Sequence, residues 1–437
     1  MCDHYHPQSC NTPPPSDAGF TRRRFLGHGL GLVSAATTVP AFLLRAGDAL
    51  AADTTMRLTS KPGVPDGRVL VVVQLSGGND GLNTVVPFAH DEYQEARPLL
   101  RIRPEDALRI PGSDDIGLHP ALTPLQEMID ARLAGIVQGV GYPNPNRSHF
   151  ASMGIWHSGQ VENAARATRG WIGSALDQAP DPTALDIINV GREAPLATLG
   201  KHTRSVSFEN ANLFRWAGRD LHSEVSDTYD AFHDQAVEAG EEDPLAFVNR
   251  TALDAQVASS RVRKAVRGGL DTPWPQSGLA NQLKMVAKMI RAELPTRVYY
   301  VNMGGFDTHA NQLGNHNRLM QQFGAAMQAF YQELDAAGHR SRVVSLAFSE
   351  FGRRVQQNAS NGTDHGVAGP AFVFGDAVKP GLLGEHPSLR KLDKGDLVHR
   401  VDFRSLYTDI LENWMKLDAA TALGKKYRPA GIFRSTA

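Results

Sequence analysis

Residues Ser349–Gly366 read Ser-Glu-Phe-Gly-Arg-Arg-Val-Gln-Gln-Asn-Ala-Ser-Asn-Gly-Thr-Asp-His-Gly, and they mark an abrupt change from apolar to polar sequence. The run directly before them, Val343–Phe348, has the length and the β-branched residues of a buried strand. Ligands of an open parallel sheet bind just outside the carboxyl ends of its strands. We therefore expect a metal or catalytic site here. Its first candidates are Glu350 at the strand end and Asp364 and His365 on the Gly-bearing loop that follows.

Further apolar runs predict buried strands that alternate with amphipathic helices. The predicted strands are Val69–Leu75, Gly135–Val140, Leu185–Val190, Ser205–Phe208, Arg297–Met303 and a last apolar segment, Ala371–Gly375. The predicted helices are Pro120–Ala134, about Ser148–Gly159, Leu279–Leu294, Leu319–Leu334 and Asp402–Lys416. This alternation predicts an α/β fold with a mostly parallel sheet flanked by helices. The charged sequence at about 227–269 predicts a helical insertion within the same domain.

The first predicted strand leads into Ser-Gly-Gly-Asn-Asp-Gly-Leu-Asn, residues 76–83. Asn79 and Asp80 are the first polar side chains after that strand. The glycines permit the backbone to approach a bound group closely. The same sequence is also favourable turn chemistry, and taken alone the plain turn is the commoner explanation.

The second predicted strand leads into Gly-Tyr-Pro-Asn-Pro-Asn-Arg-Ser-His-Phe, residues 141–150. Ser148 stands at the expected start of a helix, where a hydroxyl is either an N-cap or a nucleophile favoured by the helix dipole. Arg147 beside it fits an anionic substrate group, or is a surface arginine. His149 and His157 lie on the expected helix, and such histidines more often pack or face solvent than bind a metal.

The predicted strand Arg297–Met303 delivers Gly-Gly-Phe-Asp-Thr-His. In an extended chain, residues two apart project to the same side, so Asp307 and His309 can reach one ion together. The alternative is an Asp that caps and a His that bonds to the backbone, and the local sequence does not decide between the two.

The carboxyl ends of parallel strands lie along one edge of a sheet, so these groups are expected to meet. The groups in question are Asp80, Ser148, Asp307, His309, Glu350 and His365. Mixed oxygen and imidazole sets suit a divalent ion such as Zn, Mn, Mg or Ca. Neighbouring residues of an extended chain point in opposite directions, so Asp364, like Asn79, is expected behind the ligands.

Composition excludes several classes of function. The chain has 437 residues, a formal net charge of −1 and a mean hydropathy of −0.30, which exclude a polytopic membrane protein and give no reason to expect nucleic acid as a partner. The cysteines are Cys2 and Cys10 alone, so a disulfide framework and thiolate metal sites are excluded from the rest of the chain.

The first residues predict export. Thr-Arg-Arg-Arg-Phe-Leu at 21–26 precedes a weakly apolar segment, and Ala-Leu-Ala at 49–51 is a small-x-small cleavage pattern. Together they resemble a twin-arginine signal. We expect residues 1–51 to be this signal and 52–437 to be a single mature domain, delivered by the twin-arginine translocase to the periplasm or outside the cell. No integral membrane association is expected after cleavage; the alternative is an uncleaved anchor.

A set of motifs supports a family resemblance. They are Gly-Gly-Asn-Asp-Gly-Leu-Asn, Asn-Arg-Ser-His-Phe, Gly-Phe-Asp-Thr-His, Ser-Glu-Phe-Gly-Arg-Arg and Gly-Thr-Asp-His-Gly. In this order they resemble the bacterial domain-of-unknown-function family 1501, which is similar to the alkaline phosphatase and sulfatase superfamily. The resemblance implies an alkaline-phosphatase-like fold and a divalent metal ion. By position it implies metal ligands at Asp80, Asp307, His309, Glu350 and His365, and a nucleophile at Ser148 with Arg147 beside it.

Two functions follow from the resemblance. The first is an exported metal-dependent hydrolase that acts on phosphate or sulfate esters, either a small anionic ester or an envelope polymer. The second is a catalytically silent metal- or ligand-binding envelope protein of the same fold. Phe351 favours the second function, because the superfamily usually has an imidazole where this chain has Phe351.

Overall fold

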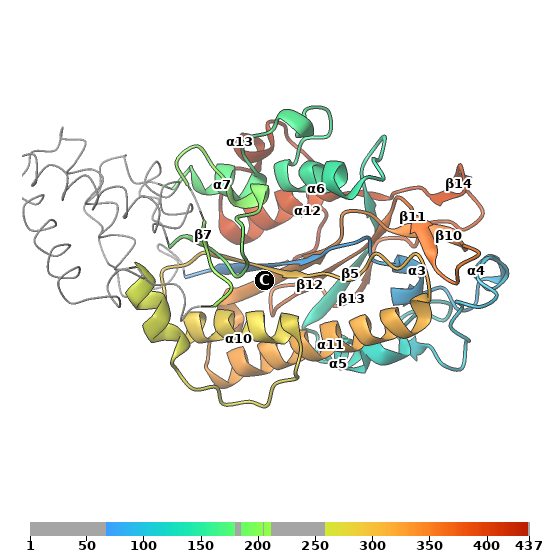
Figure 1. Cartoon of the computed structure of the whole chain (residues 1–437), viewed down its shortest axis with the longest axis horizontal. Helices are drawn as coiled ribbons and strands as arrows, with labels where there is room; N and C mark the ends of the chain where they lie inside the picture. Colours follow the sequence, from blue (N-terminus) through green and yellow to red (C-terminus); the bar gives the residue numbers. More distant parts are fainter. Residues whose placement is uncertain (1–66, 180–184, 204, 211–257, 436–437) are drawn as a thin grey trace, which may run out of the picture.

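The computed structural model describes residues 67–179, 185–203, 205–210 and 258–435 (Figure 1). The expected signal at 1–51 and most of the expected insertion at 227–269 lie outside these residues. Of that insertion, residues 258–269 are described, and residues 258–266 among them are helical. No helix in the described ranges has the length and apolar character needed to cross a membrane.

A central sheet runs through the described part of the chain (Figure 1). Its strands are β1 (Val69–Leu75), β5 (Ala134–Gly141), β6 (Ile187–Asn189), β7 (Val206–Ser207), β8 (Val298–Met303), β9 (Val343–Phe348), β12 (Gly369–Phe374), β13 (Gly381–Leu383) and β16 (Val401–Asp402). The strand order is β13-β5-β12-β9-β1-β8-β6-β7, and β16 pairs with β5. Only β12 among them runs antiparallel to its neighbours β5 and β9. The predicted mostly parallel sheet is confirmed.

Helices cover both faces of this sheet, as predicted (Figure 1). One face carries α5 (Thr123–Asp130), α10 (Gly278–Arg291) and α11 (Gln312–Ala336), and the other carries α6 (His149–Ser158), α7 (Trp171–Leu176), α12 (Phe403–Asp409) and α13 (Ala419–Leu423). Side chains of β1 alternate between the two cores: Val71 and Val73 pack on the first side, and Leu70 and Val72 on the second. This period of two is the reason why the run Val69–Leu75 is apolar throughout.

Several predicted boundaries differ from the structure. The predicted helix Pro120–Ala134 consists of a 3-10 turn and α5, and it ends early because Arg132 takes a φ of 63°. The predicted helix Asp402–Lys416 is α12 followed by a π-helical segment, Ile410–Met415. The helix α11 begins at Gln312, well before the predicted Leu319, because its first turns are polar and carry little periodic signal.

The expected Gly-bearing loop that carries His365 is a β-hairpin, which corrects the sequence-based expectation. Its strands β10 (Arg353–Gln357) and β11 (Thr363–His365) pair antiparallel. Asn358 closes the turn by accepting hydrogen bonds from the backbone of Ser360 and Gly362. Local side-chain bonding of this kind, which hydrophobic periodicity does not report, makes the tight turn.

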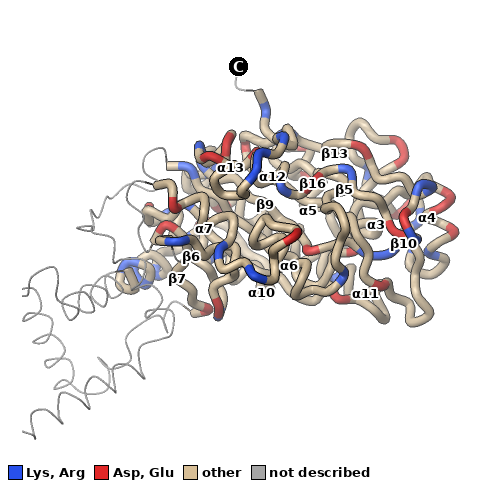
Figure 2. The backbone as a smooth tube through the Cα atoms, turned by 90° about the horizontal axis from the view of Figure 1, so that it is seen from above, with Lys and Arg blue, Asp and Glu red and all other residues tan. Residues whose placement is uncertain are grey.

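Short elements complete the described part of the chain. They are α3 (Gly81–Thr84), α4 (Asp91–Ala96), β2 (Val85–Val86), β3 (Leu108–Arg109), β4 (Gly117–Leu118), β14 (Leu392–Asp393) and β15 (Asp396–Leu397). Acidic and basic residues are interspersed along the described backbone, in keeping with the near-neutral net charge (Figure 2).

Candidate metal centre

The carboxyl ends of β1, β8 and β9 are locked together by close backbone contact. Gly77, after β1, has a φ of 120°, and a Cβ atom on it would lie 2.4 Å from the backbone nitrogen of Asp307. The amide of Gly77 also donates to Glu350 Oε1 at 2.9 Å. A glycine is therefore required here, and its contacts bring the polar residues that follow β8 and β9 to one place.

The β10–β11 hairpin holds the loop that carries His309. The side chain of Asn358 donates to the carbonyl of His309 at 3.0 Å, and a Cβ atom on Gly362 would lie 2.2 Å from the carbonyl carbon of His309. The backbone of Asn311 donates to Ser360 in the turn at 3.1 Å. These contacts place His309 beside His365 at the end of β11.

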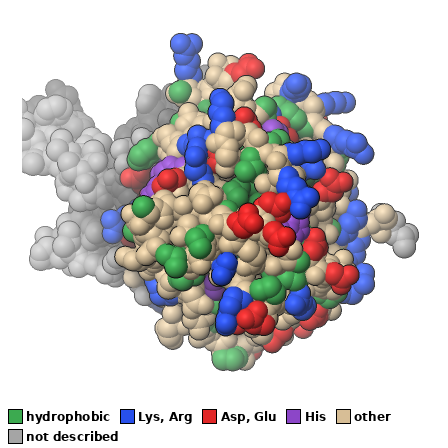
Figure 3. Space-filling view, turned by 90° about the vertical axis from the view of Figure 1, so that its right-hand side faces the viewer, with side chains coloured by type: hydrophobic (Ala, Val, Ile, Leu, Met, Phe, Trp, Pro, Cys, Tyr) green, Lys and Arg blue, Asp and Glu red, His purple; other side chains and the backbone are tan. Residues whose placement is uncertain are grey.

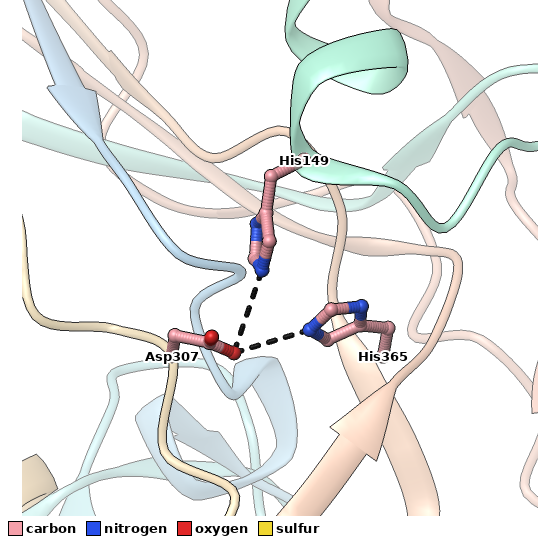
Figure 4. A group of neighbouring side chains, drawn as sticks. All are labelled: His149, Asp307 and His365. Atoms are coloured by element: carbon pink, nitrogen blue, oxygen red, sulfur yellow. Dashed lines mark hydrogen bonds and ion pairs between the residues drawn. The ribbon is translucent and has the colours of Figure 1, made fainter.

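Three imidazoles converge on one carboxylate oxygen, Asp307 Oδ1. The distances to it are 3.0 Å from His309 Nε2, 3.1 Å from His365 Nε2 and 3.5 Å from His149 Nε2. Figure 4 shows His149 and His365 directed at this carboxylate from α6 and β11. Ligand atoms of His149, Asp307 and His365 all lie within 4.8 Å of one another, so they form a group that could hold a metal ion.

The other ring nitrogen, Nδ1, of each histidine faces an acceptor. The pairs are His149 with Glu350 Oε1 (2.8 Å), His309 with Asp364 Oδ1 (3.2 Å) and His365 with the carbonyl oxygen of Arg147 (2.8 Å). An ionised carboxylate or a carbonyl can only accept, so each Nδ1 carries the proton. In the neutral ring, Nε2 then presents its lone pair to the centre, which is the usual arrangement of metal-binding histidines.

The donor atoms fit a cation. The Nε2 atoms of His309 and His365 lie 2.9 Å apart, and two lone pairs at this distance repel unless a proton or a metal ion lies between them. The Nε2 atom of His149 is buried, and no hydrogen-bond partner for it lies among the described residues. A divalent ion bound by these nitrogens and by Asp307 would satisfy all of them.

Arg353 lies behind Asp307 and keeps it ionised. The guanidinium donates to Asp307 Oδ1 at 2.7 Å from a fully buried position. Partial burial alone would raise the pKa of Asp307, but Arg353, together with His365 and His309, outweighs this effect and lowers the pKa to about 2. Asp307 is therefore ionised throughout the neutral pH range.

Glu350 and Asp364 both lie behind histidines. Glu350 is 2% exposed and accepts from Ser349 and Gly77 as well as from His149. This places it behind His149, whereas the sequence predicted a ligand. Asp364 lies behind His309, next to its Nδ1 atom. A hydrogen bond from Asn358 lowers the pKa of Asp364, so it too is ionised.

Asp80 is not brought to the three imidazoles. Its carboxylate is fully buried, pairs with Arg97 at 2.6 Å and accepts a hydrogen bond from Gln312. Burial would raise the pKa of Asp80, but the charge of Arg97 lowers it. Asn79 is also buried; its Oδ1 accepts from Thr84, while its Nδ2 has no hydrogen-bond partner within the part of the chain that the structure describes.

Ser148 and Arg147 lie at the edge of the group. Ser148 is exposed at the N-cap position of α6, and its hydroxyl forms no capping hydrogen bond. The guanidinium of Arg147 pairs with Asp396, which is 1% exposed, while the side chain of Arg147 remains 39% exposed. The hydroxyl is therefore available at the start of a helix, one residue before His149.

Sequence reasoning missed His149, which it assigned to packing or the surface. The ring of His149 lies 5.0 Å from that of Phe351 and 4.3 Å from that of His365. An imidazole from α6 therefore lies beside Phe351 and His365. One signal could have revealed it, because the first turn of a helix that follows a strand starts at the edge of the sheet where the other ligands gather.

Residues 68–422 match the family model described as Protein of unknown function (DUF1501). The chain belongs to this family. The family resemblance that the sequence motifs indicated is therefore confirmed. No curated protein matches the chain at a significant level.

Solved structures that resemble this DUF1501 protein do so distantly. A protein in the alkaline phosphatase superfamily from Vibrio parahaemolyticus is 10% identical, with 79% of this chain and 70% of that chain covered and a TM-score of 0.34. A sulfatase from Pseudoalteromonas sp. is 9% identical, with 93% and 77% covered and a TM-score of 0.36. A lipoteichoic acid synthase from Listeria monocytogenes is 11% identical, with 90% and 80% covered and a TM-score of 0.34. At these scores the likeness carries no argument about activity.

Proposed function

We propose that this DUF1501 protein is an exported, divalent-metal-dependent hydrolase of phosphate or sulfate esters. One observation carries the proposal: three histidines direct Nε2 at the ionised Asp307, while an acceptor holds Nδ1 of each ring. A structural histidine cluster has no need of three lone pairs facing one carboxylate. Export by the twin-arginine route is proposed from the sequence of residues 1–51.

The ligands proposed for the ion are His149, His309, His365 and Asp307. A set rich in imidazole favours Zn²⁺ or Mn²⁺ over Mg²⁺ and Ca²⁺, which prefer oxygen ligands throughout. When bound, such an ion would polarise an ester oxygen and lower the pKa of a hydroxyl or water next to it. Glu350, Asp364 and the carbonyl of Arg147 keep the rings in place.

The proposed nucleophile is Ser148. Its hydroxyl is exposed and makes no capping bond, so it is free to turn toward phosphorus or sulfur once it has given its proton to solvent. The amides and the dipole at the start of α6 favour the negative charge of a phosphoryl or sulfuryl group. Arg147 adds a positive charge beside this helix start, and the same guanidinium also forms an ion pair with Asp396.

A second function is favoured by the openness of the centre. Asp307 is 50% exposed and His309 is 44% exposed. The face of the molecule that carries β10 and β11 shows a mixture of acidic and basic side chains, not one dominant charge (Figure 3). A solvent-exposed centre surrounded by both acidic and basic side chains also suits a protein that binds a metal or an envelope ligand without turnover. This is the second of the two functions that the sequence suggested.

Metal analysis and an ester panel test the proposal together. The full chain is folded in the cytoplasm, purified and analysed for bound metals, and it is then assayed with 4-nitrophenyl phosphate and 4-nitrophenyl sulfate. Bound zinc or manganese together with turnover supports the hydrolase. Bound metal without turnover on any ester supports the silent binding protein, and absence of both overturns the proposal.

Single substitutions separate the roles. Ser148→Ala is expected to abolish turnover while metal content stays normal. Unchanged activity would mean that Ser148 only occupies the N-cap position of α6. His309→Ala is expected to lower metal content. His157→Ala is the matched control, because His157 lies on α6 but binds Gln74 and Tyr300 instead of the centre. Normal metal content in His309→Ala would remove His309 from the ligands.

A further inference from the structure

The guanidinium of Arg353 is enclosed by oxygen atoms next to the candidate metal centre. Its side chain is 0% exposed. Nε donates to the carbonyl of Gly78 at 2.8 Å, and Nη1 donates to the carbonyl of Thr363 at 2.8 Å. The guanidinium therefore bridges the loop after β1 and the strand β11. Such a saturated and buried arginine is part of the centre, not of the surface.

Three oxygen atoms converge on a single nitrogen, Nη2 of Arg353. They are the carbonyl oxygen of Gly77, the carbonyl oxygen of Phe306 at 3.0 Å and Asp307 Oδ1 at 2.7 Å. Two carbonyl dipoles and a carboxylate aimed at one point form a hole that suits a small cation. Asp307 Oδ1 is also the atom on which the three imidazoles converge, so this hole and the proposed metal position share one carboxylate.

The net charge of the centre also favours the binding of a single divalent ion. Glu350, Asp307 and Asp364 are three carboxylates of the centre, and Arg353 is its single buried guanidinium, which leaves a net charge of −2 when the imidazoles are neutral. One divalent ion neutralises this charge. A second divalent ion would leave the centre positively charged beside the fully buried guanidinium of Arg353, and these like charges would repel each other.

The remaining carboxylate that the sequence predicted as a metal ligand already has a partner of opposite charge. Asp80 is paired with Arg97, which is itself fully buried. Across the described ranges, a single group of three or more ligand side chains was found, and it is that of His149, Asp307 and His365. The described residues thus offer ligands for one ion and a filled hole beside it.

We propose that Arg353 is a fixed cation of the centre, whose Nη2 fills a hole that would otherwise take a second metal ion, so that the centre binds one divalent ion per chain. This inference rests on the proposed function, because it requires that the first ion binds. It assigns Arg353 a positioning role, since its side chain is buried and reaches no substrate.

The wild-type chain provides the first test. The full chain is stripped with a chelator, reloaded with Zn²⁺ or Mn²⁺, desalted and analysed by mass spectrometry for metals. We expect saturation at one ion per chain. Saturation at two ions overturns this inference but leaves the proposed metal-dependent function intact. Binding of no ion overturns both, so the two failures are distinguishable.

Opening the hole provides the second test. Arg353→Ala should leave oxygen atoms without a donor, and we expect it to take up a second ion when reloaded in the presence of Ca²⁺. Guanidinium, at a concentration too low to unfold the wild type, should return the count to one and raise the melting temperature of this variant. Arg354→Ala is the matched control, because Arg354 is the next residue but lies against Asp396 at 3.8 Å.

The outcomes of the second test are decisive in both directions. A count of one in Arg353→Ala together with no effect of guanidinium on its melting temperature overturns the inference, as does an equal guanidinium response in Arg354→Ala. If Arg353→Ala fails to fold, Arg353→Lys keeps the positive charge and is expected to retain a count of one. A count of two in Arg353→Lys contradicts the proposal that a fixed charge sets the number of ions.

Discussion

Single side chains behind the proposed ligands are expected to control how tightly the centre binds a metal ion. Glu350 is buried and holds His149 from behind, so its charge favours the ring orientation that exposes Nε2. We expect Glu350→Gln to weaken metal affinity by about 10- to 100-fold, as is typical for such partners of metal-binding histidines. The measurement is competitive titration of the stripped protein with a metal indicator.

The control for this substitution is Glu333→Gln. Glu333, on α11, is equally buried, but its carboxylate accepts from Asp271 and Thr272 and pairs with Arg291. Glu333→Gln should lower stability and leave metal affinity unchanged. Equal loss of metal affinity in both variants would mean that Glu350 acts through general stability and not through His149.

At the level of elements, the contact between the ends of β1 and β8 fixes the position of Asp307. We expect Gly77→Ala to separate these ends, because the added Cβ would meet the backbone of Asp307 at 2.4 Å. Gly112→Ala is the matched control: Gly112 also has a positive φ, of 82°, but nothing lies within 4 Å of its Cβ position. Gly112→Ala should lower stability by roughly 1 kcal/mol, the backbone effect alone.

The separation of the two ends should also be visible in metal binding. Gly77→Ala is expected to lose more stability than Gly112→Ala and to lose metal affinity as well. Denaturant unfolding and metal titration of the two variants measure these effects. Equal stability and normal metal affinity in Gly77→Ala would show that the strand ends can move apart without disturbing Asp307.

The buried pair of Asp80 and Arg97 connects α3 to the β10 strand. Arg97 also donates to the carbonyls of Arg354 and Val355 at 2.8 and 2.9 Å, so its loss affects both elements. Arg97→Met would leave Asp80 buried without a counter-charge, and we expect it to lower stability by about 3–5 kcal/mol. Replacing both partners by apolar residues should be less harmful than this single change, as measured by denaturant unfolding.

For the whole molecule, buried neutral histidines predict that stability falls in acid. Burial lowers the pKa of His119 to about 3 and the pKa values of His157 and His316 to about 4. Their ordinary pKa is 6.5, so between pH 6.5 and about 4 the unfolded chain binds more protons than the folded one. The free energy of unfolding is therefore highest above pH 6.5 and falls as the pH falls through this window.

The expected slope is about 1.4 kcal/mol per pH unit for each histidine in the middle of the window. Denaturant unfolding at pH 7.5, 6.0 and 5.0 measures this slope. His157→Gln should reduce the slope by the contribution of one histidine. A free energy of unfolding that stays constant from pH 7.5 to 5.0 would contradict the burial of these rings as neutral groups.

Much of the sheet could be predicted from local sequence. The runs of β1, β8 and β9 are apolar because both sides of each strand are buried, and this requirement is visible in any short window. The spacing of Asp307 and His309 predicted a shared position, and they lie 3.0 Å apart at Oδ1 and Nε2. β12 could not be assigned its direction, because an antiparallel and a parallel buried strand have the same residue pattern.

The amino-acid sequence alone determined the family, the alternation of strands and helices, and the edge of the sheet where polar groups gather, because each of these depends on residues close together in the chain. Only the tertiary structure decided the members of the centre. His149 meets Glu350 across 201 residues, and Arg147 meets His365 across 218 residues. The carboxylate of Asp80 forms an ion pair with Arg97 and not with the imidazoles. Such pairings depend on packing between distant segments, on which the spacing of residues along the chain carries no information.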